Sequence, residues 1–418
     1  MTDILMPRFR RVAPIAARRS RRAVHALLSQ LAVGRLDLID PQGQAWPFSS
    51  PVTSQAASPT APRAVIQVHD DAVYARVLGS GDIGLGEAYI AGEWSSPDLV
   101  ALMTLLLRNR DALERVVYGR WWGTLLHRVM HRLHRNSRRG SRRNIEAHYD
   151  LGNPFYRLWL DPSMNYSSAW FDGDDARPLE RAQHAKVDRA LDEAGVRAGS
   201  RVLEIGCGWG ALAEAAARRG ASIDGITLSK EQWAWGTQRL HDAGLSAHAR
   251  LRLEDYRDLG NAAGFEPYDA VVSIEMFEAV GRAYWPGYFA TLARCLAPGG
   301  RACVQTITIR DDLFERYAAS TDFIQQYVFP GGLLPGPQAF REEATKAGLV
   351  VERELAFGTD YARTLHQWRQ AFLGALPQVR ALGYDERFVR LWEFYLAYCE
   401  AAFTTGNTDV RQFTLRHG

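Results

Sequence analysis

The chain has 418 residues, a length that predicts two or three domains with a sizeable buried core. Apolar side chains make up 47% of it and charged side chains 23%, which is the composition of an ordinary soluble protein. Its four cysteines, Cys207, Cys295, Cys303 and Cys399, have no CxxC spacing and no histidines at metal-ligand spacing. Neither a zinc site nor a disulfide framework is therefore indicated, and we expect no bound metal and a reducing, cytoplasmic location.

The N-terminus contains arginines but no apolar segment after them, so it does not resemble a secretory signal. The longest apolar run, residues 99–107, is too short to span a bilayer. Any contact with a membrane is expected to be peripheral.

The formal net charge is only +3, but arginine is concentrated in residues 8–22 and 108–143. Such patches suit an anionic surface, either phospholipid head groups or nucleic acid. They are equally typical of a solvated linker.

Four parts are expected along the chain. In order they are a basic, mobile tail over residues 1–22, a small α+β domain over 23–135, an Arg-rich linker over 136–143 and a larger domain over 144–418. The small domain begins with an irregular segment that contains prolines, and strand and helix patterns follow it.

From residue 201, strands and helices alternate with short connections. The predicted strands cover residues 201–205, 222–228, 248–254, 268–274, 301–309, 349–356 and 410–415, and the predicted helices cover 211–219, 230–243, 284–296, 338–347, 362–382 and 385–405. This alternation predicts an α/β fold with a parallel, doubly wound sheet. Ligands of such sheets bind at the carboxyl ends of the strands.

The turn after the first of these strands carries the strongest signal. Residues 201–210 read RVLEIGCGWG, and glycines 206, 208 and 210 can adopt positive φ and leave space for a ligand against the backbone. A dinucleotide fingerprint needs a glycine five residues after the first, where this chain has Ala211. The spacing instead resembles motif I of S-adenosylmethionine (SAM) methyltransferases, and a tight turn in an unrelated α/β protein is the alternative.

Polar residues at the next strand ends suit a methionyl nucleoside. Glu204 is placed to receive an ammonium group, and Thr227 and Gln232 are candidates for ribose hydroxyls. Ser229 and Gln232 equally fit the capping box of helix 230–243.

Asp255 and Tyr256 follow the third strand, where a carboxylate can accept from the adenine amine and a ring offers its face. Glu275 and Glu278 follow the fourth strand. Two carboxylates at one site cost desolvation energy unless they are paired or used, so they are candidates for catalysis.

Several ordered motifs between residue 64 and the C-terminus resemble the cyclopropane fatty acid synthase family. They are HYDLGN at 148–153, YSSAW at 166–170, LEIGCGWG at 203–210, TLS at 227–229, DYRD at 255–258, FPGG at 329–332 and YLAYC at 395–399. The first of these and the FPGG turn are specific to that family among methyltransferases.

The resemblance implies a class I SAM methyltransferase domain over 144–418, with helical insertions that line an acyl channel. It implies an enzyme that methylates a double bond in an acyl chain of a membrane phospholipid, giving a cyclopropane fatty acid. The N-terminal domain would dock on the bilayer and support a homodimer, and no nucleic acid would be bound.

The resemblance also assigns residues. SAM would contact Tyr166, Ser167, Gly206, Gly208, Thr227, Leu228, Gln232, Asp255 and Tyr256, with Glu204 and Gly210 added from the strand-end pattern. The active site would contain Glu278 and Tyr361, with His148 near its entrance and the backbone of Ile307 along its wall.

The chain departs from the family where that family holds a bicarbonate ion as its base. Ser168 stands where a Cys is common, Gln305 where a His is common, and Glu275 where a Gly is common. These changes weaken the expectation of bicarbonate. We hypothesise that the Glu275 carboxylate lies near the anion position and steers the carbocation, so that Ser168, Gln305 and Glu275 belong to the catalytic set.

The product is open at this stage. Loss of a proton from the transferred methyl closes a cyclopropane, whereas a hydride shift followed by proton loss gives a methylene- or methyl-branched chain. A nucleic-acid methyltransferase and a non-catalytic lipid-binding protein are the remaining alternatives. The missing Asn/Asp-Pro-Pro-aromatic loop counts against the former, and the complete set of strand-end residues counts against the latter.

Overall fold

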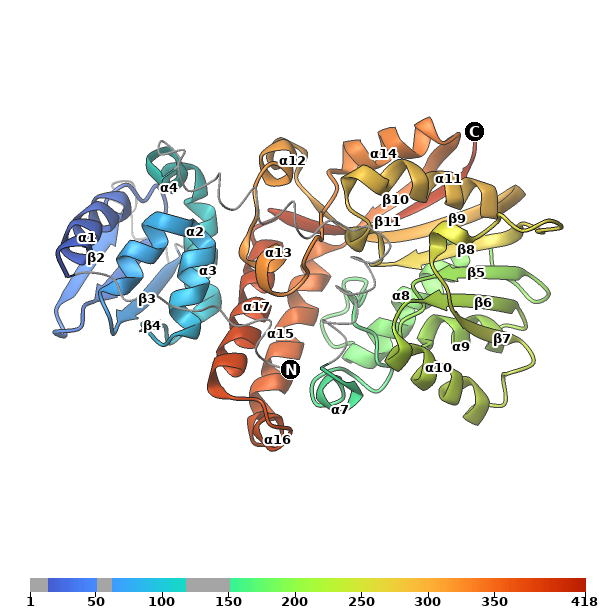
Figure 1. Cartoon of the computed structure of the whole chain (residues 1–418), viewed down its shortest axis with the longest axis horizontal. Helices are drawn as coiled ribbons and strands as arrows, with labels where there is room; N and C mark the ends of the chain where they lie inside the picture. The colour runs from blue at the N-terminus through green and yellow to red at the C-terminus, as the bar shows by residue number, and fades with distance from the viewer. Residues whose placement is uncertain (1–13, 51–61, 118–150) are drawn as a thin grey trace. The chain divides into compact units, whose positions relative to one another are not determined.

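The computed structural model describes residues 14–50, 62–117 and 151–418, and these form two compact units (Figure 1). The first unit contains the N-terminal part of the chain together with residues 319–328 and 372–407. The second contains the remaining described residues up to 318, residues 329–371 and the C-terminal residues 408–418.

Over its described residues, the first unit contains a four-stranded sheet. Its strands are β1 (Arg35–Ile39), β2 (Ala45–Ser49), β3 (Arg63–Val68) and β4 (Trp94–Ser95), in the order β2-β1-β3-β4. Alternation along β3 buries Ala64, Ile66 and Val68. One face of this sheet is therefore apolar and packs against helices.

Helices from three stretches of sequence complete the first unit. They are α1 (Pro14–Leu28), α2 (Ala72–Ile90), α3 (Leu99–Arg108), α4 (Arg110–Val117), α13 (Phe323–Tyr327), α16 (Leu376–Ala381) and α17 (Glu386–Thr404). Helix α17 packs on α2 and α3. Gly86 on α2 permits close packing, because a Cβ there would lie 3.0 Å from the ring of Phe394 on α17 and 2.4 Å from the ring of Phe323 on α13.

The structure differs from the expected N-terminal organisation in two places. Helix α1 begins at Pro14, inside the expected mobile tail, because Val24, Leu27 and Leu28 give it a buried face. Strands β1 and β2 lie in the segment that we expected to be irregular. Among its described prolines, Pro41 lies in the turn before β2 and Pro47 lies in β2 itself.

The domain boundary also differs from the expected 144–418 range. Residues 372–407 lie in the first unit, where Phe394 packs against Phe323 with ring centroids 4.6 Å apart. The aromatic residues of α17 therefore form helix-packing core in the first unit. Sequence periodicity shows that a helix has an apolar face but does not identify the partner of that face.

The second unit contains a seven-stranded sheet, counted over its described residues. Its strands are β5 (Arg201–Ile205), β6 (Ser222–Thr227), β7 (Ala249–Leu253), β8 (Tyr268–Ile274), β9 (Leu296–Ile309), β10 (Leu349–Ala356) and β11 (Thr408–His417). Their order is β10-β11-β9-β8-β5-β6-β7. Strands β5 to β9 pair in parallel, and β11 and β10 extend the sheet antiparallel. The predicted strands and the α/β fold class are confirmed.

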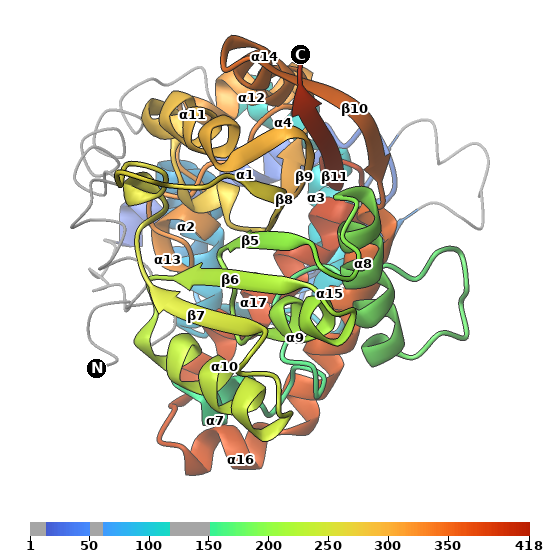
Figure 2. The same cartoon turned by 90° about the vertical axis from the view of Figure 1, so that its right-hand side faces the viewer.

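Helices cover both faces of this sheet (Figures 1 and 2). One face carries α8 (Leu179–Glu193), α9 (Ala211–Arg218) and α10 (Lys230–Asp242), and the other carries α11 (Trp285–Cys295) and α14 (Pro337–Lys346). Alternation along β5 places Val202 in the core with α8 and α9 and Leu203 in the core with α11. Both faces are buried, which explains the nearly continuous apolar strands.

The second unit also contains elements outside these two layers. They are α7 (Asn153–Tyr156), α12 (Asp311–Ala318), α15 (Gly358–Gly374, which ends in the first unit) and the 3-10 turns at 256–258, 277–279 and 282–284. The helix expected over 362–382 is divided between α15 and α16. Among the described residues, no helix has the length and apolar character needed to cross a membrane.

Candidate active site

The glycine turn after β5 provides an open backbone surface. Gly206 has φ of 88°, and a Cβ there would lie 2.8 Å from Cγ of Met276. Gly208 also has positive φ, and nothing lies within 4 Å of its missing Cβ. Gly210 packs against Gly236 at the start of α9. Gly206 therefore allows the close approach of Met276, Gly208 leaves space for a ligand, and Gly210 allows close helix packing.

Glu204, at the end of β5, is buried with 4% of its surface exposed. Its Oε2 has no hydrogen-bond partner among the described residues. Burial raises the pKa of Glu204 to about 8, against the opposing charges of Lys186 and Arg239. A buried carboxylate oxygen without a donor is suited to an incoming cation.

Lys186 is a buried cation that the sequence analysis did not select. Its Nζ donates a hydrogen bond to Ser167 Oγ at 2.6 Å, and burial lowers its pKa to about 8. The sequence feature that could have identified it is the position of this lysine among the apolar residues on the buried face of α8. Lys186 holds Ser167, one of the expected SAM contacts, and lies close enough to lower the pKa of Glu204.

The turn after β6 combines capping with a polar contact. Ser229 caps α10 by accepting a hydrogen bond from Gln232 N–H at 3.2 Å. The side chain of Gln232 does not complete a capping box, because its Oε1 accepts from the Thr227 hydroxyl at 3.0 Å. Thr227 and Gln232 are therefore adjacent, and the half-buried Leu228 lies between them in sequence.

Asp255 and Tyr256 lie after β7 as expected, but the aspartate is engaged. Its carboxylate accepts from the guanidinium of Arg257 at 2.6 and 2.8 Å. The Tyr256 ring packs against Tyr288 with centroids 5.6 Å apart.

Glu275 follows β8 in a left-handed backbone conformation, with φ of 48°. Its Oε1 accepts from Ser168 N–H at 2.8 Å and from Gln305 Nε2 at 2.7 Å. Its Oε2 accepts from the Tyr361 hydroxyl at 2.6 Å. Burial raises the pKa of the carboxyl, and these donors oppose the rise.

The contribution of Ser168 differs from the expected one. Its hydroxyl donates to the carbonyl of Ala169 at 2.9 Å, so only its backbone N–H faces Glu275. The residue type at 168 therefore has less effect on this contact than the position of the loop.

Glu278 lies one turn further along the chain, with Oε1 accepting from Ile307 N–H at 2.5 Å. Its Oε2 is buried without a hydrogen-bond partner among the described residues. Burial raises the pKa of Glu278 to about 8, and the nearby charge of Glu275 adds to the rise. The backbone carbonyl of Glu278 also accepts from Leu333 N–H, directly after the FPGG turn.

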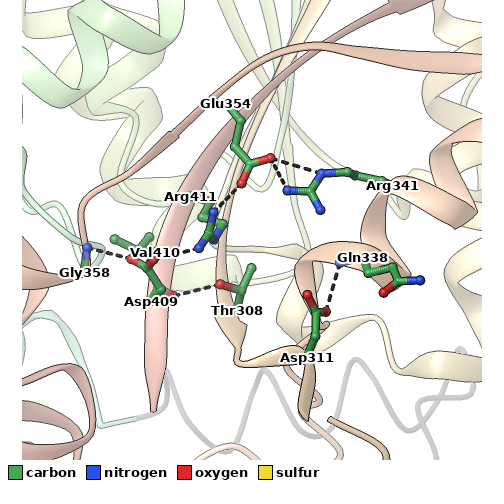
Figure 3. Close-up of polar contacts among 9 residues, drawn as sticks. All are labelled: Thr308, Asp311, Gln338, Arg341, Glu354, Gly358, Asp409, Val410 and Arg411. Carbon is green, nitrogen blue, oxygen red and sulfur yellow. Dashed lines mark hydrogen bonds and ion pairs between the residues drawn. The ribbon is translucent and has the colours of Figure 1, made fainter. Parts of the chain in front are cut away.

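The start of α15 is tied to β11 (Figure 3). Asp409 Oδ1 accepts from Gly358 N–H at 2.8 Å, and Oδ2 pairs with Arg411 at 3.0 Å. Arg411 also pairs with Glu354 on β10. Since Tyr361 lies in the first turn of α15, these contacts fix the position from which its hydroxyl reaches Glu275.

The same helix holds the loop that carries Ser168. Asp360 accepts from Phe171 N–H at 2.7 Å, and the Thr364 hydroxyl accepts from Ala169 N–H at 3.2 Å. Helix α15 therefore positions two of the three donors to Glu275.

Aromatic side chains surround Tyr166. Its ring lies within 5.5 Å, centroid to centroid, of the rings of Tyr156, Trp159 and Trp368. These faces provide an apolar surface with the negative potential that favours a cation. His148, expected near the entrance, lies outside the described residues.

The residues present fit SAM. The unpartnered oxygen of Glu204 suits the methionyl ammonium, and the space at Gly208 admits a ligand against the backbone. They do not fit bicarbonate in the expected cage, since Ser168 N–H, Gln305 Nε2 and the Tyr361 hydroxyl all donate to Glu275. Within the described residues, no group of three potential ligand side chains could hold a metal ion.

The chain is similar to known sequences over most of its length. The family model for mycolic acid cyclopropane synthetase matches residues 136–413. Tuberculostearic acid methyltransferase UfaA1 of Mycobacterium tuberculosis is 42% identical over 376 residues, covering 88% of this chain and 86% of that protein. Cyclopropane-fatty-acyl-phospholipid synthase of Escherichia coli is 34% identical over 357 residues, covering 84% and 88% respectively.

Two solved structures are also similar to this chain. The cyclopropane synthase MmaA2 of Mycobacterium tuberculosis has a TM-score of 0.60 and 33% identity, covering 66% of this chain and 97% of that one. The mycolic acid cyclopropane synthase CmaA1, solved with SAH and CTAB, has a TM-score of 0.60 and 34% identity with the same coverage.

Proposed function

The chain belongs to the mycolic acid cyclopropane synthetase family, and from this premise we propose that it transfers a methyl group from SAM to an acyl-chain double bond in a membrane phospholipid. It is a SAM-dependent methyltransferase that acts on unsaturated lipids. The observation that supports the proposal is the buried Glu275 carboxylate, which accepts hydrogen bonds from Ser168 N–H, Gln305 Nε2 and the Tyr361 hydroxyl.

Bound SAM supplies an electrophilic methyl group on a sulfonium. Glu204 would bind its ammonium group, with Lys186 and Ser167 beside it and the backbone of Gly206 and Gly208 beneath. Further contacts are proposed from Tyr166, Gly210, Thr227, Leu228, Gln232, Asp255 and Tyr256.

The acceptor alkene is a weak nucleophile, so the site must align it and keep water out. Methyl addition to one alkene carbon leaves a cation on the other. We propose that the carboxylates of Glu275 and Glu278 and the ring of Tyr166 stabilise this charge. Glu275 then accepts a proton from the substrate in place of bicarbonate. Tyr361 and Gln305 orient its carboxylate for that transfer.

We propose an acyclic, methylene- or methyl-branched product as the first candidate. A relative with 42% identity over most of the chain is named for methylating a fatty acid. A carboxylate fixed to the protein also replaces the free anion that ring-forming members are expected to use. The cyclopropane predicted from the sequence is the second candidate, supported by the 34% identical synthase from Escherichia coli.

We further propose peripheral membrane association in the cytoplasm and a homodimer. Arg18, Arg19 and Arg22 are exposed on α1, opposite its buried face, and suit anionic head groups. Sedimentation with phosphatidylglycerol vesicles, with phosphatidylcholine vesicles as control, tests the association. Analytical ultracentrifugation tests the dimer, and cell fractionation tests the location.

The function is tested by incubating the protein with deuteriomethyl-labelled SAM and vesicles of unsaturated phospholipid. NMR and mass spectrometry of the released fatty acids then locate the label. A cyclopropane retains two deuterons on a ring carbon, a methylene branch retains two on an olefinic carbon, and a methyl branch retains three.

Absence of labelled lipid, with SAM binding intact, would favour a non-catalytic lipid-binding protein. Label found in RNA and not in lipid would favour a nucleic-acid methyltransferase.

A further inference from the structure

Of the three donors to Glu275, only Gln305 is a side-chain amide that could also present an acceptor to the carboxylate. A glutamine amide has a donor end and an acceptor end of similar shape, and rotation by half a turn exchanges them. In one orientation Nε2 donates to Glu275, and in the other a carbonyl oxygen faces the carboxylate. The contacts on the far side of Gln305 decide between these two.

Those contacts come from Gln412, which lies opposite Gln305 where β11 pairs with β9. Gln412 Nε2 donates to Gln305 Oε1 at 3.0 Å. Both glutamines are buried, with at most 1% of their surface exposed. Water therefore does not compete for these hydrogen bonds.

Gln412 is itself fixed by two groups that cannot reverse their roles. Arg189, on α8, is always a donor, and it donates to Gln412 Oε1 at 2.5 Å. The backbone carbonyl of Lys186 can only accept, and it accepts from Gln412 Nε2 at 3.2 Å. The second proton of Nε2 is then left for Gln305.

We infer that Arg189 and Gln412 are positioning residues that set the polarity of Gln305, so that its Nε2 always faces the Glu275 carboxylate. The guanidinium of Arg189 donates to Gln412, Gln412 donates to Gln305, and Gln305 donates to the carboxylate of Glu275. The fixed donor at Arg189 thus determines the direction of every hydrogen bond in this series of contacts. The inference rests on the proposed role of Glu275 as the base. It assigns a role to two residues that do not contact Glu275.

The sharpest test is Gln412→Glu, which is nearly isosteric and keeps an acceptor for Arg189. Glutamate cannot donate, so Gln305 is expected to turn its Nε2 toward residue 412 and its carbonyl oxygen toward Glu275. Losing one hydrogen bond to a charged group corresponds to roughly a 10- to 100-fold effect. We expect kcat to fall by about that factor, the acid limb of the kcat–pH profile to move to higher pH, and SAM affinity to remain unchanged.

Gln305→His in the Gln412→Glu background provides a rescue. A protonated imidazole donates from both ring nitrogens, so it can satisfy the carboxylate introduced at position 412 and that of Glu275 together. We expect kcat and the acid limb to return toward the wild-type values. Arg189→Met should have a smaller effect in the same direction as Gln412→Glu, because the Lys186 carbonyl still orients Gln412.

Thr414→Val is the matched control. Thr414 lies on the same strand, is equally buried, and donates to Glu193 on α8 at 2.7 Å. The variant loses a buried hydrogen bond to the same helix without touching either amide. Its pH profile should therefore match that of the wild type.

A wild-type pH profile for Gln412→Glu, or a double variant no better than the single one, would overturn the inference. A wild-type protein that methylates no lipid would overturn the proposed function instead. In that case a thermodynamic cycle between Gln412→Glu and Glu275→Gln still tests the inference by unfolding. Glu275→Gln should relieve the destabilisation caused by Gln412→Glu, and strictly additive effects would contradict the proposed polarity.

Discussion

Glu275→Gln is the most direct perturbation of the proposed base. The amide oxygen can still accept from Ser168 N–H and Gln305 Nε2, and the new amino group can donate to the Tyr361 hydroxyl. The backbone conformation at φ of 48° is as demanding for glutamine as for glutamate. The variant should therefore fold and leave the SAM contacts in place.

The expected loss is that of a general base. Proton transfer by a positioned side chain contributes roughly 10²- to 10⁴-fold, or about 3–5 kcal/mol in the activation free energy. The assay is the initial rate of label transfer from deuteriomethyl-labelled SAM to lipid, with SAM affinity measured separately by calorimetry. Glu400→Gln, at a buried glutamate of the first unit, is the matched control and should keep wild-type activity.

The pH dependence gives an independent check. Burial raises the pKa of Glu275 above the usual carboxyl value. The base works only when deprotonated, so wild-type kcat should fall with decreasing pH at a midpoint above that value. Residual activity of Glu275→Gln should lack this limb. A loss of activity of about threefold or less would be far smaller than the loss expected for a general base and would refute the role of Glu275. A parallel loss of SAM binding would instead show that the substitution disturbs the structure of the site.

Three further predictions concern the same site. Glu275→Gly should be partly rescued by added bicarbonate, because the three donors become available to a small anion; wild-type rates should not respond, and an unrescued variant would count against the cage. Lys186→Met should weaken SAM binding by about 10-fold in calorimetry, which is roughly the contribution of one hydrogen bond to a charged group. The SAM affinity of this variant should also rise more steeply with pH than that of the wild type, because the pKa of Glu204 is higher without the lysine. Gly206→Ala should lower the unfolding free energy by about 1–3 kcal/mol in urea and abolish SAM binding, because its Cβ would lie 2.8 Å from Met276; unchanged stability would contradict this.

Local sequence patterns were sufficient to predict the strands and helices of the second unit. Strands β5 to β11 and the helices between them follow from apolar periodicity and from glycines at turns. The glycine spacing at 206–210 indicated the cofactor class, and the strand ends supplied the candidate carboxylates. These features depend on neighbours within a few residues, which is why the sequence contains them directly.

The contacts of Glu275 depended on the tertiary structure. Tyr361 lies 86 residues away and Ser168 lies 107 residues away, and only the fold brings them to one carboxylate. Sequence comparison could place Ser168 and Gln305 near the site, but not show that Ser168 acts through its backbone. Nor could it find Gln412, whose amide has a role only because β11 pairs with β9 in this register.

The sequence by itself determined the order of elements, the cofactor class and the identity of two acidic residues, because these follow from short-range periodicity and turn chemistry. Only the tertiary structure decided which donors surround Glu275 and that residues 372–407 pack in the first unit. The physical reason is that a buried apolar face or polar side chain needs a packing or hydrogen-bond partner, but only the long-range packing of the chain determines which residue is that partner.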